Sequence, residues 1–462
     1  MNRRSILLLS AAFLTGAFFA GPAAHVFVPR LAAAYADVLP QSDDRARELA
    51  LFGEVMARVQ ADYVQPVTTK ALIGNALNGM LSGLDPHSGY LDAKQWHEMQ
   101  VETQGRFGGL GMTVTGEDGL LKVVSPIDGT PASRAGIKPG DLITAVDGKT
   151  IEGLTLTEAV DRLRGPPDTQ VHITIKRQGD AKPIELTLTR EIIHMQVVKS
   201  QRYGNIGYVR LAEFNDETDR GLRDAIAVFR KQDGSKLDGL ILDLRNNPGG
   251  LLDQAVAVSD DFLTSGKIVS TKGRQPDDTQ VWRAHGGDML HGLPIVVMIN
   301  DGSASASEIV SGALQDHNRA VLLGTRSFGK GSVQTLFPLR NGGAIRLTTA
   351  RYYTPDGRSI QGKGIEPDVV VHESDNPQPE FGPAHEWDLN NTISNSGGVT
   401  NVSPRRSDLP IAAGIPEKPP KDWPKLDPDK PDTDFQLHEA LILARRMVAD
   451  GNLGQPVQRV SR

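Results

Sequence analysis

Strand-like and helix-like segments alternate from residue 204 to residue 323, and this alternation limits the fold more than any other feature of the sequence. Short apolar runs predict strands at 205–211, 239–244, 294–300 and 320–323. Amphipathic segments predict helices between them at 219–231, 252–263 and 306–316. Because each strand returns to the same sheet through a covering helix, this pattern is typical of a layered α/β domain.

The segments next to this core follow different patterns. Residues 43–102 carry apolar side chains at three- and four-residue steps, which predicts a helical N-terminal cap. From 103 to 190 a glycine-rich stretch leads into short β-like runs and turns, so we expect a separate small β-domain. The core then occupies 191–373 and includes a hairpin of 335–339 with 344–353, joined by an Asn-Gly-Gly turn. The chain is therefore an α/β multidomain protein.

The C-terminal part divides into two segments. Residues 374–432 are rich in Pro, Asp, Asn and Ser and poor in apolar residues, which predicts a disordered or loosely attached linker. An amphipathic run at 435–448 predicts a closing helix within a last segment, 433–462.

The N-terminus has the pattern of an export signal. Two arginines precede an apolar run at 6–20, and a small-x-small cleavage sequence follows at 34–36, so 1–36 is interpreted as a signal peptide. The apolar character continues to about Val28, and an uncleaved anchor in the inner membrane is an equal alternative. Either form would place the folded part in the periplasm or cell envelope.

Composition excludes several classes of function. A chain of 462 residues with 39% apolar content predicts two or three folded units. The net charge of −6, with both signs mixed, gives no footprint for nucleic acid and no basic patch for a membrane. The absence of cysteine removes disulfides, thiolate nucleophiles and cysteine-based metal sites. The eleven histidines form no His-Glu-x-x-His pattern, so we expect neither a catalytic metal nor a cofactor.

A candidate nucleophile follows the predicted strand at 294–300. A serine-rich run at 303–308 leads into the next predicted helix and places Ser305 at its N-terminus, where N–H groups and the helix dipole stabilise a developing oxyanion. The same run is also a capping box, in which Ser305 accepts an N–H bond and Glu308 reaches back. On the local sequence alone, the capping box is the better interpretation.

Lysine is the remaining candidate base for such a serine. The chain has no Gly-x-Ser-x-Gly elbow, and His317 falls at the far end of the helix. Lys330 follows the next strand and should emerge near the sheet edge that carries Ser305. To act as a base it must be neutral, so burial must lower its pKa from about 10.4 to near 7 or 8. Gln334 could hold the amine by a hydrogen bond, whereas the alternative is an ordinary solvated lysine.

With these residues in place, the chain resembles the carboxyl-terminal processing proteases over about 71–371. In that family the middle serine of a Ser-Ala-Ser-Ala-Ser-Glu run is the nucleophile, a lysine base follows 25 positions later and a glutamine four positions after it. Ser305, Lys330 and Gln334 match both spacings, which favours catalysis over capping. Further blocks match the family at 84–88, 243–250 and 355–360.

The resemblance implies a fold, an activity and an oxyanion hole. The fold would be a Clp protease and crotonase-like catalytic core, and the oxyanion hole would be the backbone amides of Gly249, Gly250 and Ala306. The activity would be that of a serine endopeptidase that cleaves exported polypeptides near or from their C-termini through an acyl-enzyme.

The inserted β-domain resembles a PDZ domain. Gly108, Gly109, Leu110 and Gly111 match the PDZ loop whose N–H groups hold a peptide's terminal carboxylate. Motifs further along the domain match the following turn and hairpin, which favours PDZ over an isolated glycine-rich turn. The expected partners are polypeptides with free C-termini. The sequence leaves open an adaptor protein, a homo-oligomer, and whether the PDZ domain activates or inhibits.

Other motifs support competing functions less well. The Gly-x-x-x-x-Gly-Lys run at 324–330 is similar to a phosphate-binding loop, but Gly331 stands where Ser or Thr would bind magnesium, and a β-like run follows. The Ser-x-x-Lys of penicillin-binding proteins requires a helix, which Gly329 and Gly331 disfavour. The alternative that stays open is a catalytically silent PDZ scaffold, against which the intact Ser-Lys-Gln pattern argues.

Overall fold

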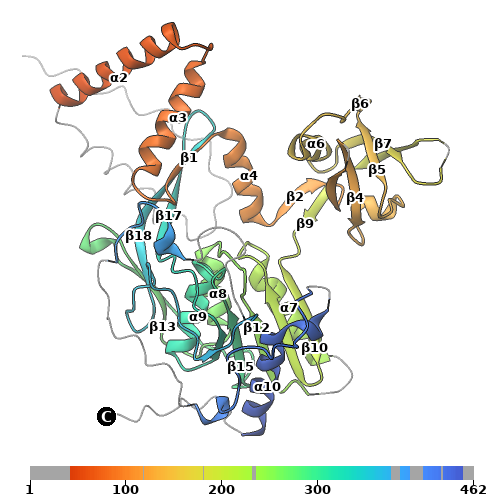
Figure 1. The fold of residues 1–462 in the computed structure, drawn as a ribbon, viewed down its shortest axis with the longest axis vertical. Helices are drawn as coiled ribbons and strands as arrows, with labels where there is room; N and C mark the ends of the chain where they lie inside the picture. The colour runs from red at the N-terminus through yellow and green to blue at the C-terminus, as the bar shows by residue number, and fades with distance from the viewer. Residues whose placement is uncertain are drawn as a thin grey trace, which may run out of the picture. The chain divides into compact units, whose positions relative to one another are not determined.

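The computed structural model describes most of the chain (Figure 1). The described residues are 42–117, 119–180, 182–231, 236–375, 385–395, 409–427 and 430–450. The signal peptide or anchor predicted at 1–36 lies outside them. Within these ranges, no helix has both the length and the apolar character needed to span a bilayer. The chain divides into two compact units, 1–76 and 77–462.

Helices account for most of the segment predicted to be a helical cap. The first unit contains α2 (Ser42–Asp62) and the beginning of α3 (Thr69–Ser82). In the second unit, α4 (Ala93–Gln104) begins at Asp92, whose carboxylate accepts the Gln95 N–H at 2.9 Å, and ends at a left-handed Gly105. The helical character is as predicted, and the capping role of the segment stays a prediction.

The core contains a six-stranded sheet in the order β10-β11-β12-β15-β16-β19, in which only the β10–β11 pair is antiparallel. The strands are β10 (Val198–Tyr203), β11 (Ile206–Leu211), β12 (Gly239–Asp243), β15 (Ile295–Ile299), β16 (Val321–Gly324) and β19 (Val369–Val370). Both β12 and β15 are buried at every position, as expected for parallel strands covered on both faces.

Helices cover the two faces of this sheet (Figure 1). Leu240 and Leu242 pack in one apolar cluster with α7 (Thr218–Lys231), α8 (Leu252–Asp260) and α9 (Ala306–Asp316). Ile241, which points to the other face, packs with α10 (Phe435–Ala449). The alternation follows from the two-residue period of a strand and makes α10 part of the core.

A second, antiparallel sheet lies on the path β1-β18-β13-β14, with β17 also paired to β18. Its strands are β1 (Gly89–Leu91), β13 (Lys267–Lys272), β14 (Gln280–Arg283), β17 (Ser332–Pro338) and β18 (Ala344–Tyr353). The β17–β18 pair is the predicted hairpin. Because β1 pairs with β18, the residues just before β1 lie at the hairpin.

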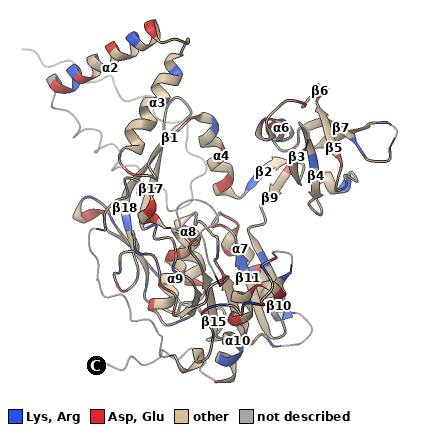
Figure 2. Cartoon of the chain, in the orientation of Figure 1, with Lys and Arg blue, Asp and Glu red and all other residues tan. Residues whose placement is uncertain are grey.

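The inserted domain has its own sheet and its own apolar core. Its strands are β3 (Met112–Glu117), β4 (Leu120–Pro126), β5 (Leu142–Val146), β6 (Lys149–Thr150), β7 (Gln170–Lys176) and β8 (Ile184–Thr189), with helices α5 (Pro131–Arg134) and α6 (Leu156–Leu163). At its two ends β2 (Arg106–Gly109) pairs antiparallel with β9 (Glu191–His194). Figure 2 shows acidic and basic residues interspersed over these elements and over the core.

Parts of the segment predicted as a loosely attached linker instead contact the core. Glu386, in the short helix η3 (Glu386–Asp388), is 1% exposed and donates its N–H to the Phe328 carbonyl at 2.9 Å. Leu409 and Ile411, at η4 (Pro410–Ala412), pack against the apolar cluster that contains α10. The average composition of the segment predicted poor packing, but a few well-placed side chains are enough to attach these stretches.

Candidate active site

Three loops of the core follow neighbouring parallel strands at one edge of the sheet. The turn at 245–250 follows β12, the loop that carries Ser305 follows β15, and the loop that carries Lys330 follows β16. The carboxyl ends of parallel strands meet at the same edge, where open α/β sheets place their sites.

Ser305 has a backbone conformation that an ordinary helix cap does not have. Its φ is 54° and its ψ −109°, whereas an N-cap residue is extended. A conformation of this kind costs on the order of 1–3 kcal/mol for a non-glycine residue, so surrounding contacts must hold it. Ser305 is 6% exposed, and its side chain shares a hydrogen bond with Tyr352. Burial raises the pKa of Tyr352 to about 12, and the hydrogen bond with Ser305 opposes this rise.

The buried carboxylate of Glu308 connects the serine loop to the lysine loop. One oxygen, Oε2, accepts the N–H of Ser305 at 2.8 Å and the N–H of Lys330 at 2.9 Å. The other, Oε1, accepts the Ser327 hydroxyl at 2.6 Å and the Gly329 N–H at 2.7 Å. Burial raises the pKa of Glu308 to about 7, and these four hydrogen bonds oppose the rise. The sequence assigned Glu308 only a capping role, so its contact with the lysine loop was missed.

Lys330 has the environment that a lysine base requires. Burial lowers its pKa to about 8; the carboxylates of Glu386 and Glu308 oppose this shift, and Arg346 adds to it. The ammonium nitrogen donates a hydrogen bond to Oε1 of Gln334. A lysine with a pKa near 8 is partly neutral at neutral pH, so it can accept a proton.

Gln334 is itself held by a chain of hydrogen bonds. Its Nε2 donates to Oγ of Ser332 at 2.9 Å and to Oγ1 of Thr348 at 3.1 Å. Thr348 in turn donates to the carboxylate of Asp85 at 3.0 Å, which also accepts the Ser88 hydroxyl at 2.7 Å. With both amide protons donated, the amide oxygen of Gln334 must face Lys330. The block at 84–88 therefore supports the lysine, a role that its sequence did not indicate.

The glycines at 249 and 250 bring the turn after β12 close to Ser305. Gly249 has a φ of 104°, and a Cβ atom there would lie 2.8 Å from the Ser305 Cβ. Its N–H donates to Oδ1 of Asn247 at 2.9 Å, and the oxyanion-hole role expected of this N–H stays a prediction. Two backbone hydrogen bonds join this turn to Phe214, one to the Gly249 carbonyl and one from the N–H of residue 251. The N–H of Gly250 takes part in neither of them. Ala306, the first residue of α9, has no intrahelical acceptor for its N–H.

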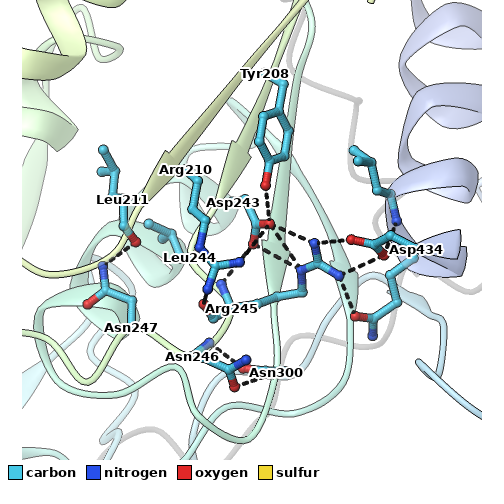
Figure 3. Close-up of polar contacts among 12 residues, drawn as sticks. Tyr208, Arg210, Leu211, Asp243, Leu244, Arg245, Asn246, Asn247, Asn300 and Asp434 are labelled. Carbon is cyan, nitrogen blue, oxygen red and sulfur yellow. Dashed lines mark hydrogen bonds and ion pairs between the residues drawn. The ribbon is translucent and has the colours of Figure 1, made fainter. Parts of the chain in front are cut away.

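A buried ionic network anchors this turn to the C-terminal helix (Figure 3). Burial alone would raise the pKa of Asp243, but the guanidinium of Arg245, 2.7 Å away, holds it below its usual range. Arg245 also contacts Asp434, the N-cap of α10, at 2.7 and 2.9 Å. Asn246 and Asn300 exchange two hydrogen bonds of 2.8 Å, joining the turn to the serine loop.

Only part of the predicted carboxylate-binding loop is a loop. Gly108 and Gly109 lie in β2 and pair with β9, opposite Ile192 and Glu191. Leu110 and Gly111 form the connection to β3, and the Gly111 carbonyl accepts the hydroxyl of residue 130 at 2.8 Å. The sequence could not distinguish the two strand residues from the two loop residues, because all four lie in one glycine-rich stretch.

The fold and the site define a peptidase with an inserted PDZ domain, and comparisons with known proteins agree. Residues 205–371 match the model of peptidase family S41, and residues 122–177 match a PDZ domain model. A carboxy-terminal-processing protease of Bartonella bacilliformis is 54% identical over 72% of this chain and 76% of that protein. A probable CtpA-like serine protease of Staphylococcus aureus is 38% identical, and the match spans 68% of this chain and 62% of that protein.

Two solved structures are also similar to parts of the chain. A photosystem II D1 C-terminal processing protease is 31% identical over 72% of this chain and 87% of that chain, with a TM-score of 0.42. The PDZ domain of a carboxy-terminal protease from Vibrio cholerae, solved with a peptide, is 25% identical over 20% of this chain and 99% of that domain, with a TM-score of 0.19. By its identity to the Bartonella protein, the chain belongs to the carboxy-terminal-processing proteases of family S41. It is a serine protease with a PDZ domain.

Proposed function

We propose that this protease cleaves exported polypeptides near or from their C-termini through an acyl-enzyme on Ser305, with Lys330 as the base and Gln334 as the residue that orients it. The observation that carries the proposal is the Glu308 carboxylate, which binds the N–H groups of both Ser305 and Lys330. One buried side chain thereby fixes the nucleophile and the base relative to each other. The lowered pKa of Lys330 makes its neutral, proton-accepting form accessible near neutral pH.

The steps follow from these positions. Neutral Lys330 takes the hydroxyl proton of Ser305 as its oxygen attacks the scissile carbonyl, and the resulting ammonium returns a proton to the leaving amine. The negative charge on the tetrahedral intermediate falls at the N-terminus of α9, where the Ala306 N–H and the Gly250 N–H are the proposed oxyanion donors. A water molecule activated by Lys330 then hydrolyses the acyl-enzyme.

The PDZ domain is proposed to hold the free C-terminus of the substrate. Leu110 and Gly111, at the start of β3, are the proposed carboxylate-binding positions, and the peptide would add as a strand. The Vibrio cholerae PDZ domain, which was solved with a peptide, supports this role. The basic and apolar N-terminal sequence supports export to the periplasm or cell envelope.

Cleavage of casein by the purified full chain tests the proposal, with a chelator present and no nucleotide. We expect cleavage by the wild type and by Ser265→Ala and Lys363→Ala, which change exposed residues, and none by Ser305→Ala or Lys330→Ala. Equal cleavage by Ser305→Ala would mean a different nucleophile. Because no other protein is added, cleavage of casein by the wild type would also show that no adaptor is required. No cleavage by any variant would leave two options, a latent enzyme that requires a PDZ ligand or an adaptor, and the catalytically silent scaffold.

A further inference from the structure

A second buried carboxylate, which the mechanism above does not use, lies behind the lysine loop. Glu386 is 1% exposed, and both of its oxygens contact Nε2 of His87, at 2.8 and 3.1 Å. Its Oε1 also accepts the amide of Gln361 at 2.9 Å. Two buried polar side chains, Glu386 and Gln361, and the partly buried His87 thus converge on one point beside the active site, although their positions in the sequence are far apart.

This group is connected to the backbone on both sides of Lys330. The backbone N–H of Glu386 donates to the carbonyl of Phe328 at 2.9 Å. The side chain of Gln361, which Glu386 holds, accepts the Gly331 N–H at 3.1 Å through its Oε1. Only a glycine at 331 lets the two chain segments come this close, because a Cβ atom there would lie 2.3 Å from the backbone nitrogen of Gln361. Glu308 therefore holds the middle of the loop 328–331 through the N–H groups of residues 329 and 330. Glu386 holds the two ends of the same loop, residue 328 directly and residue 331 through Gln361.

We propose that Glu386 is a positioning residue for the lysine base: it fixes the loop 328–331 through Gln361 and places a negative charge beside Lys330. The inference rests on the proposed function, in which Lys330 is the base. Glu386 does not touch the reacting atoms, so its effect must pass through the position and the proton affinity of the lysine.

The charges around Lys330 determine in which direction Glu386 changes the pKa of the lysine. Burial lowers the pKa of Lys330, and Glu386 is the largest of the charges that oppose the fall. Glu308 and Asp85 act in the same direction as Glu386, and Arg346 acts in the opposite direction. Without the carboxylate at 386, the lysine would lose its proton at a lower pH and would also be a weaker base. The protein would then have more neutral lysine at neutral pH but less catalytic power per neutral lysine.

The test is the pH profile of kcat/KM for a peptide substrate, measured from pH 6 to pH 10 with the full chain. Glu386→Gln removes the charge and keeps an oxygen that can accept from Gln361. Its acid limb should move to lower pH by roughly one unit, and its plateau should fall about tenfold. Glu439→Gln, which changes a buried carboxylate in α10, is the matched control and should leave the acid limb in place.

Two further variants separate the possible failures. An unmoved or raised acid limb in folded Glu386→Gln, as judged by circular dichroism and thermal melting, would overturn the inference. If that variant does not fold, Glu386→Asp takes its place: the retracted carboxylate should move the limb in the same direction by less, and an unchanged limb and plateau would also overturn it. Lys330→Ala distinguishes the two proposals, because wild-type activity in that variant would overturn the proposed base itself, and the inference with it.

Discussion

Replacement of Lys330 by methionine should make the protein more stable at neutral pH while it abolishes cleavage. Burial lowers the pKa of this lysine from 10.5 to about 8, which means that the folded state disfavours the charged form. At pH 7 a shift of this size corresponds to about 3 kcal/mol of lost stability. The methionine removes that loss and leaves the amide oxygen of Gln334 without its donor, which costs about 1 kcal/mol. The net gain should therefore be about 2 kcal/mol.

The gain should also depend on pH, with a sign that follows from the direction of the shift. Because the folded-state pKa of Lys330 is depressed, the unfolded chain binds more protons between pH 8 and pH 10.5, and the wild type becomes more stable as the pH rises through this range. The cost of burying the lysine falls from about 3 kcal/mol at pH 7 to about 2 kcal/mol at pH 9. The advantage of the methionine variant should then shrink to about 1 kcal/mol.

Urea unfolding at pH 7 and pH 9, followed by tryptophan fluorescence, measures both values, with Trp282 in β14 reporting on the core. Lys363→Met changes an exposed lysine and serves as the control, with an expected effect within about 0.5 kcal/mol at both pH values. A methionine variant at 330 that is less stable than the wild type, or whose advantage does not change with pH, would refute the argument that burial depresses this pKa.

Three other substitutions test the supports of the site. Arg245→Met should lower the free energy of unfolding by about 3–5 kcal/mol in urea titrations, because the fully buried Asp243 carboxylate loses its closest cationic partner and keeps the Tyr208 hydroxyl and the more distant Arg210; a change below 1 kcal/mol would contradict this. Gly250→Ala should abolish casein cleavage, since its Cβ would lie 2.1 Å from the Phe214 carbonyl oxygen, and full activity would show that the turn can move. Glu308→Gln should reduce kcat/KM at least a hundredfold while circular dichroism stays unchanged, and a loss below tenfold would remove its proposed role.

Local patterns in the sequence were enough to predict the architecture of the core. The helix predicted at 306–316 is α9 at the same bounds, and the strand predicted at 294–300 contains β15. Apolar periodicity succeeds here because both faces of the sheet are covered, so that each element must be apolar where it packs. The order of the strands then predicted that the loops carrying Ser305 and Lys330 would share a sheet edge.

Contacts between residues far apart in the chain could not be predicted in this way. His87 and Glu386 are separated by 299 positions, and the segment around Glu386 has the composition of a linker. The Gly249 N–H donates to the Asn247 side chain two residues away, a contact that the sequence did not indicate. Neither outcome leaves a periodic or compositional pattern, because each depends on one side chain reaching one backbone or charged group. Such supports become visible only when the chain is folded.

The two carboxylates beside Lys330 help to explain how a partly buried, desolvated lysine can remain a useful base. Desolvation alone would lower the pKa of Lys330 and would weaken it as a base at the same time. A lysine that has lost too much proton affinity accepts a proton poorly from a serine hydroxyl. Glu308 and Glu386 both oppose the fall of the Lys330 pKa. In the part of the chain that the structure describes, neither carboxylate forms an ion pair with the ammonium of Lys330, which donates its hydrogen bond to the neutral Gln334. A direct ion pair would hold the proton on the lysine. Glu308 instead binds the loop backbone directly and Glu386 holds it through Gln361, and both carboxylates act on the charge of Lys330 without pairing with it. The same side chains can therefore fix the position of the base and limit the fall of its pKa.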